Sequence, residues 1–168
     1  EGAGVRVLAY HMPDDPRKEW NTTLVQGTMH KTHNLDIIPA MGTEAESLLL
    51  CGREGVVRLD QTDNGWKEQW IAKHPADNPD LQGAGEVRYG AFAGGQPYVV
   101  TIEPMHGDKL VLYTPPVGGP KNGTWQRRIL TSELVDGHAI ATHDLLGLNN
   151  RQIVVGWRAQ QKIGKVAV

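Results

Sequence analysis

The sequence has almost no cysteine and no long apolar run. Its single cysteine, Cys51, excludes an internal disulfide. The thiol lies in the apolar run Leu48-Leu-Leu-Cys51, which indicates a buried side chain rather than a nucleophile. That run has the length of a strand, far short of the roughly 20 apolar residues that a membrane-spanning helix needs. We therefore expect no membrane segment.

The sequence also lacks a strong charge of one sign. Its 17 basic and 19 acidic residues give a formal net charge of -2. Such a balance provides no electrostatic case for binding nucleic acid or an anionic membrane. No signal peptide is visible, and two glycosylation sequons, at Asn21 and Asn122, permit a secreted or periplasmic location without requiring one. The localisation stays open.

Glycine and proline are frequent, with 20 and 10 residues among 168, which favours short strands and turns. No segment longer than a turn has the apolar period of a helix. Instead, one hairpin pattern recurs, and its equivalent positions are Val5, Val56, Leu110 and Val166. The steps between them are about 51, 54 and 56 residues, which is the period of β-propeller blades.

A second pair of strand-like segments lies between successive hairpins. These pairs are residues 33–38 with 46–51, 86–90 with 98–102, and 138–144 with 152–157. Each repeat is therefore predicted to be a blade of four short antiparallel strands, with helix nearly absent. The strands of the last hairpins open at Trp20, Trp66 and Trp125, which we interpret as packing residues of the blades.

The predicted fold is all-β, a partial β-propeller over residues 1–168. The blades fall approximately at 1–25, 31–72, 83–130 and 138–168, so the first and last are incomplete. A little more than three blades do not close a ring, which usually has 4–8 blades. We expect the rest of the propeller to come from the same chain or from another one.

The blade pattern predicts a site at one mouth of the central channel. The first strands of three blades start at His33, Glu86 and His138. Because the first and second strands are antiparallel, the ends of the second strands lie on that same face. Those ends carry Arg53, Glu103, His106 and Arg158.

Each of these residues also has a structural interpretation. A histidine at the start of a strand can simply be hydrogen-bonded to a neighbouring loop, and Glu103 can accept the amides of its turn. His106 is the strongest functional candidate, because Gly107 beside it leaves room for a ligand. Asp36, His143 and Asp144 are interpreted as stabilising the sheet or its rim.

The loops between the first two strands of each blade argue against calcium. The loop from Asp144 has leucines at two positions where a propeller calcium loop has oxygen ligands, and loops 40–45 and 93–97 lack the aspartates of that pattern. A set of histidine and glutamate side chains in the channel is compatible with zinc or a similar divalent metal.

Several short motifs occur in a characteristic order, at residues 13–17, 33–39, 52–56, 83–85, 103–107, 113–116 and 125–128. In this order they resemble the propeller domain of the fungal aldos-2-ulose dehydratases and of related FG-GAP-type (VCBS-like) repeat proteins. The resemblance implies a section of a seven-bladed propeller and a metal-assisted lyase that dehydrates a ketosugar such as 1,5-anhydro-D-fructose. Glu86 departs from the pattern, in which a small residue is expected.

With the resemblance, the candidate residues receive roles. We expect His106 and Glu103 to be catalytic, Arg53 and Arg158 to hold sugar hydroxyls, and a divalent metal to be bound by His33, His138 and Glu86. The alternative is a non-catalytic FG-GAP-type module that binds carbohydrate or protein through the same face. A third possibility is a purely architectural wall of a larger protein.

Overall fold

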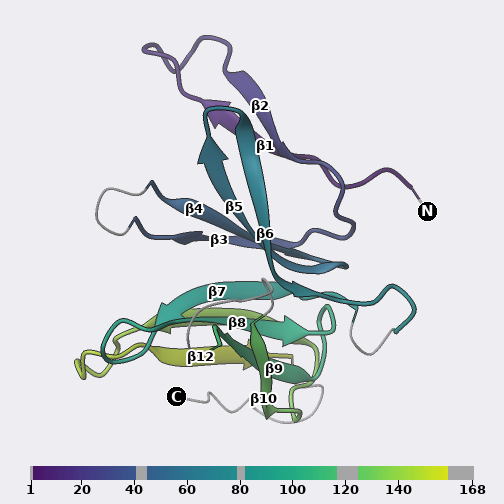
Figure 1. The fold of residues 1–168 in the computed structure, drawn as a ribbon, viewed down its shortest axis with the longest axis vertical. Coiled ribbons are helices and arrows are strands. Elements are labelled where there is room, and N and C mark those ends of the chain that lie inside the picture. Colours follow the sequence, from purple (N-terminus) through teal and green to yellow (C-terminus); the bar gives the residue numbers. More distant parts are fainter. Residues whose placement is uncertain (1, 41–44, 79–81, 117–124, 159–168) are drawn as a thin grey trace.

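The computed structural model describes residues 2–40, 45–78, 82–116 and 125–158. Within these ranges the chain forms twelve strands and no helix. Two four-stranded antiparallel sheets are flanked by two hairpins, and they follow one another in chain order (Figure 1). No helix among these residues is long and apolar enough to cross a membrane.

Every sheet is built from strands that are consecutive in the sequence. The first hairpin pairs β1 (Val7–His11) with β2 (Asn21–Gln26), and the last pairs β11 (Gly137–His143) with β12 (Gln152–Trp157). The first sheet comprises β3 (Asn34–Ile38), β4 (Ser47–Gly52), β5 (Gly55–Thr62) and β6 (Gly65–Lys73). The second comprises β7 (Glu86–Ala91), β8 (Pro97–Glu103), β9 (Lys109–Thr114) and β10 (Gln126–Thr131).

The predicted fold class is confirmed, since the architecture is that of a β-propeller section. Every strand predicted within the described ranges is present, and most of the strand ends differ from the expected ones by one or two residues. Trp20 and Trp125 lie one residue before β2 and β10 rather than inside them. The repeat start at 165–168 and the sequon at Asn122 lie outside the described residues.

Three apolar layers join the sheets, and the alternation of side chains along β4 and β8 supplies them. On β4, Leu49 and Cys51 face the second sheet, while Leu50 packs with Val25 and Met29 next to the first hairpin. On β8, Val99 faces the first sheet, while Val100 packs toward β11 and β12. Both strands are buried on both faces, which explains their nearly continuous apolar sequences.

The cysteine belongs to the layer between the two four-stranded sheets. Cys51 has no exposed surface, and burial raises the pKa of its thiol to about 12. The thiol is therefore protonated at neutral pH and is a poor nucleophile. The prediction of a buried, structural cysteine is confirmed.

The inner strands β3, β7 and β11 lie side by side and are joined by side chains rather than by a hydrogen-bond ladder. The carboxylate of Asp36 accepts a 2.8 Å hydrogen bond from the backbone N–H of Tyr89. The hydroxyl of Thr142 donates a hydrogen bond to the carbonyl of Tyr89. Asp144 accepts hydrogen bonds from two amides of its own loop, those of Leu148 and Asn149. The stabilising roles predicted for Asp36 and Asp144 are confirmed.

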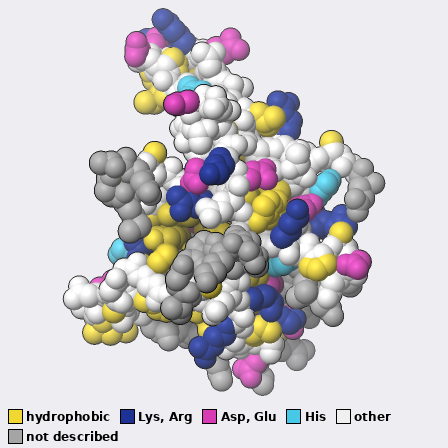
Figure 2. All heavy atoms as spheres, viewed as in Figure 1, with side chains coloured by type: hydrophobic (Ala, Val, Ile, Leu, Met, Phe, Trp, Pro, Cys, Tyr) yellow, Lys and Arg dark blue, Asp and Glu magenta, His cyan; other side chains and the backbone are white. Residues whose placement is uncertain are grey.

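Charged side chains of both signs are scattered over the surface seen in Figure 2, between separate groups of hydrophobic side chains. This appearance agrees with the nearly balanced charge of the sequence.

We predict that Gly90→Ala destabilises the second sheet. Gly90 is the register partner of Tyr98, and a Cβ at Gly90 would lie 2.1 Å from the Cζ atom of that ring. Tyr98 has little room to move, because it is 1% exposed and its hydroxyl donates to the carbonyl of Arg151. Such overpacking costs roughly 1–3 kcal/mol of unfolding free energy, measurable by denaturant titration.

The matched control is Gly156→Ala in β12, where a Cβ would meet only the Cβ of Ala139 at an ordinary 3.7 Å. This variant should lie within about 0.5 kcal/mol of the parent protein. Equal stability of the two variants would contradict the packing described for Tyr98.

Candidate functional site at a cluster of three histidines

Three imidazoles from three neighbouring blades meet at one end of the inner strands. His33 immediately precedes β3, His106 lies in the turn after β8, and His138 is the second residue of β11. Nε2 of His106 lies 3.3 Å from Nε2 of His33, and Nδ1 of His106 lies 3.3 Å from Nδ1 of His138. The structure thus brings together three residues that are up to 105 positions apart, counted from His33 to His138.

The turn after β8 holds His106 in a defined direction. His106 has a φ of 53°, in the left-handed region that non-glycine residues seldom adopt. The turn is closed by a 2.7 Å hydrogen bond from the N–H of Gly107 to the carbonyl of Pro104. A Cβ at Gly107 would lie 2.4 Å from the carbonyl oxygen of Glu103, so the turn needs glycine there.

The hydrogen bonds of the cluster define a consistent set of neutral tautomers. Nδ1 of His33 lies 2.8 Å from the carbonyl of Gly85, which can only accept, so this nitrogen carries the proton. Nε2 of His33 is then the acceptor for Nε2–H of His106. By the same reasoning Nδ1 of His106 accepts from Nδ1–H of His138. This series of hydrogen bonds ends at Nε2 of His138, which retains a lone pair.

The surroundings favour the neutral form of His106. Partial burial is the largest cause that lowers the pKa of His106, and the neighbouring His33 and His138 rings and the charge of Arg158 act in the same direction. Glu86 opposes them. A neutral imidazole at neutral pH is able to accept a proton, which suits a general base.

Glu86 lies behind His33, on the side away from His106. Its Oε1 is 3.9 Å from Nδ1 of His33, and its Oε2 accepts a 2.8 Å hydrogen bond from the amide of Asn34. Arg88 approaches the same carboxylate at 3.5 Å. From this position Glu86 can orient His33 and balance a positive charge on it. Glu86 lies near Nδ1 of His33, whereas Nε2 of the same ring faces His106.

Glu103 is not brought into the histidine cluster. Its side chain is fully buried and accepts hydrogen bonds from the hydroxyls of Thr101 and Tyr113 at 2.8 and 2.6 Å. It also accepts two from the guanidinium of Arg127, at 3.1 and 2.7 Å. The structure therefore gives Glu103 a supporting place beneath the turn, and its partners are side chains rather than the turn amides.

The two predicted arginines lie in different places. Arg158 follows β12 and is close enough to His106 to influence its pKa. Arg53 follows β4 and lines a cleft together with Met105, the residue before His106. Neither position conflicts with substrate binding, and the role stays a prediction for both.

Whether these side chains fit a divalent metal can be judged from the donor atoms. Imidazole nitrogen is a ligand of zinc, and the hydrogen bond from Nδ1 of His33 to a carbonyl is the arrangement usual for a metal-binding histidine. However, His106 presents different nitrogens to its two neighbours, and the described ranges contain no group of three ligands arranged to hold an ion. With these tautomers, Nε2 of His138 offers a lone pair directly, and Nε2 of His33 offers one only if the hydrogen bond from His106 opens.

Several residues at this site escaped the sequence-based prediction. The carbonyl of Gly85 has no sequence signal, because any residue supplies one. Asn34 next to His33 could have been noticed as a polar residue at a strand start. Tyr113 and Arg127 carry no local signal at all, since only the fold places them around Glu103.

The fold and the histidine cluster together define a β-propeller section with a potential ligand site on one face. A family model described as the β-propeller domain of aldos-2-ulose dehydratase matches residues 2–116. The chain is also 32% identical over 139 residues to the aldos-2-ulose dehydratase of Phanerodontia chrysosporium, covering 74% of this chain. The chain therefore belongs to the family of aldos-2-ulose dehydratase β-propeller domains, as the sequence motifs indicated.

The match covers only a small part of that relative. The chain spans 15% of the length of the Phanerodontia chrysosporium enzyme. His33 and His106 lie inside the region matched by the family model, whereas His138 lies beyond it.

The lowered pKa of His106 predicts a loss of stability at acidic pH. An unfolded chain takes up a proton on this residue near the ordinary histidine pKa of about 6.5, while the folded chain resists it. The free energy of unfolding should therefore fall as the pH drops below about 6.5, and the loss is complete below the folded pKa. His74, whose pKa is lowered mainly by burial, contributes in the same sense.

Thermal unfolding at about pH 7.5 and about pH 5.5 tests this prediction. His106→Asn should lose less stability between the two values than the parent protein. Asparagine is the suitable replacement, because it tolerates the left-handed backbone of residue 106. An equal loss in both proteins would show that His106 is not the group responsible.

Proposed function

We propose that the chain forms part of a sugar dehydratase that removes water from a ketosugar such as 1,5-anhydro-D-fructose, with the histidine cluster as its acid–base centre. The observation that carries the proposal is the hydrogen-bonded series of three imidazoles, contributed by three successive blades. Membership of the aldos-2-ulose dehydratase propeller family supports the reaction class.

The reaction needs a base that can reach the proton on the carbon next to the carbonyl. Removal of the proton on the α-carbon leaves its electron pair in an enolate, and the hydroxyl on the β-carbon then departs with a proton as water. The product is a conjugated enone. A base that is neutral at the working pH and can return its proton to the leaving hydroxyl serves both steps.

The cluster is suited to move such a proton. When Nε2 of His138 accepts a proton, its Nδ1 proton can pass to His106. The Nε2 proton of His106 can then pass to His33. The positive charge then rests on His33, next to the carboxylate of Glu86 and the carbonyl of Gly85. His106 is thus the central member of the series, and Glu86 acts as a positioning residue.

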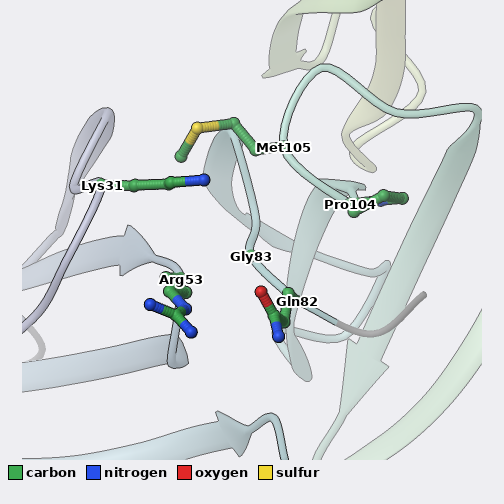
Figure 3. Close-up of a pocket in the computed structure, with 6 residues that line it drawn as sticks. All are labelled: Lys31, Arg53, Gln82, Gly83, Pro104 and Met105. Atoms are coloured by element: carbon green, nitrogen blue, oxygen red, sulfur yellow. The ribbon is translucent and has the colours of Figure 1, made fainter. Parts of the chain in front are cut away.

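A divalent metal ion is part of the proposal. Nε2 of His33 and Nε2 of His138 would hold it in place of the hydrogen bond from His106 and of the transferred proton, and the bound ion would supply positive charge to polarise the sugar carbonyl. In that state His106 would be the remaining base, so the metal-bound cluster and the proton relay are alternatives. In this proposal Arg158, which follows β12, and Arg53, which lines a cleft (Figure 3), hold sugar hydroxyls.

We predict that His106→Asn abolishes dehydration without unfolding the protein. Removing a general acid–base group typically lowers the rate of the catalysed step by about 10²–10⁴-fold. The measurement is the appearance of enone absorbance from 1,5-anhydro-D-fructose with the natural full-length protein, alongside circular dichroism.

The control is His143→Asn, which replaces an exposed histidine at the other end of β11. It should retain the parent activity. Sugar binding without turnover in the parent protein would instead favour a non-catalytic FG-GAP-type binding module, and full activity of His106→Asn would remove the cluster from the reaction.

Metal binding gives a separate prediction. The purified protein should bind zinc or a similar ion after dialysis, and His33→Asn should reduce the bound metal several-fold because one of two ligands is lost. If the metal-bound cluster is the active state, chelation should stop turnover, and added metal should restore it. Turnover that persists through complete chelation would contradict the metal-assisted step.

A further inference from the structure

The outer strand of the first hairpin, β2, is an open sheet edge without charge. Among the strands of the described ranges β2 pairs with β1 alone, and it occupies the position that β6 and β10 occupy at the outer ends of the two four-stranded sheets. The outer strands β6 and β10 carry exposed charged side chains, among them Lys67, Glu68 and Arg128, whereas the sequence of β2 is Asn-Thr-Thr-Leu-Val-Gln. Charged side chains commonly protect an open edge against pairing with another chain. The edge of β2 lacks this protection.

Exposed apolar side chains surround the start of this edge. Tyr10, Met12 and Trp20 are 62%, 73% and 37% exposed. They are the chain neighbours of Asn21, the first residue of β2, and of its register partner His11 in β1. Figure 1 shows this hairpin projecting past the other strands at one end of the molecule. Soluble proteins rarely leave large apolar patches uncovered, so this end of the hairpin is a site where two chains could associate.

The residue at the start of the edge is also the acceptor of a glycosylation sequon. Asn21-Thr-Thr23 has a threonine in the third position and no proline in the second. The side chain of Asn21 is exposed, so a glycan on its Nδ2 would extend into solvent and leave the core intact. Because β2 is an outermost strand, further blades of the propeller would leave Asn21 accessible.

We infer that Asn21 is an N-glycosylation site and that its glycan shields the open edge of β2. In the transfer, Nδ2 of Asn21 loses a proton and bonds to the anomeric carbon of a lipid-linked oligosaccharide, while the bond from that carbon to the donor's pyrophosphate breaks and the lipid pyrophosphate leaves. The bulky, hydrophilic glycan keeps the backbone of a second chain away from β2. The inference places the natural protein in the secretory pathway and is independent of the proposed dehydratase function.

Peptide mapping by mass spectrometry of the natural full-length protein, produced in its own host, tests the modification. The peptide that contains Asn21 should carry the mass of a glycan, and enzymatic deglycosylation should convert this asparagine to aspartate. Asn21→Gln and Thr23→Ala should each abolish the glycan, because each destroys the sequon. Thr22→Ala is the matched control, since it changes the same strand and leaves the sequon intact.

Light scattering during incubation at elevated temperature tests the shielding. Asn21→Gln should aggregate several-fold faster than the parent protein, and Thr22→Ala should aggregate at the parent rate. Adding Leu24→Lys to Asn21→Gln should slow the aggregation again, because Leu24 is 52% exposed on the same strand and a lysine there protects the edge by charge. An unmodified Asn21 in the natural protein would overturn the inference, as would aggregation of Asn21→Gln no faster than that of Thr22→Ala.

Discussion

The arrangement of the site depends on the apolar layer between the two four-stranded sheets. Leu49 and Cys51 of β4 pack there against Val99 of β8, and none of the three has exposed surface. With this layer closed, the loops at the ends of the sheets meet and exchange backbone hydrogen bonds, from Gly83 to Arg53 and from Ala84 to Gly52. The positions of the histidines and of the cleft follow from that contact.

One short turn combines a buried charge with an accessible imidazole. Glu103 points inward, where its ion pair with Arg127 and its hydrogen bond from Tyr113 tie β8, β9 and β10 together. Only the carboxylate of this pair is fully buried, since the Arg127 side chain keeps 28% of its surface exposed, so the loss of Arg127 would leave a buried charge unpaired. His106, three residues later, points to the cluster. The rigid base of the turn is what holds this imidazole against two rings from other blades.

The repeat could be read from the sequence because each strand carries its own evidence. Apolar residues with turn residues at both ends mark β4 and β8, and the spacing of about 50 residues marks the blades. The convergence of His33, His106 and His138 was also accessible, because antiparallel pairing places strand starts and strand ends on one face. The direction of the Glu103 side chain could not be predicted, because the sequence Glu-Pro is compatible with a carboxylate that points inward or outward.

The sequence by itself determined the class of fold, the order of the strands, and the convergence of three histidines on one face. These properties depend on local patterns and on strand pairing between neighbours. Only the tertiary structure decided which nitrogen each imidazole presents, that Glu86 lies behind His33, and that Lys31 and Arg53 share a cleft. These outcomes depend on packing between blades, where the contacting residues are about 20 to more than 70 positions apart and leave no joint signal in a single sequence.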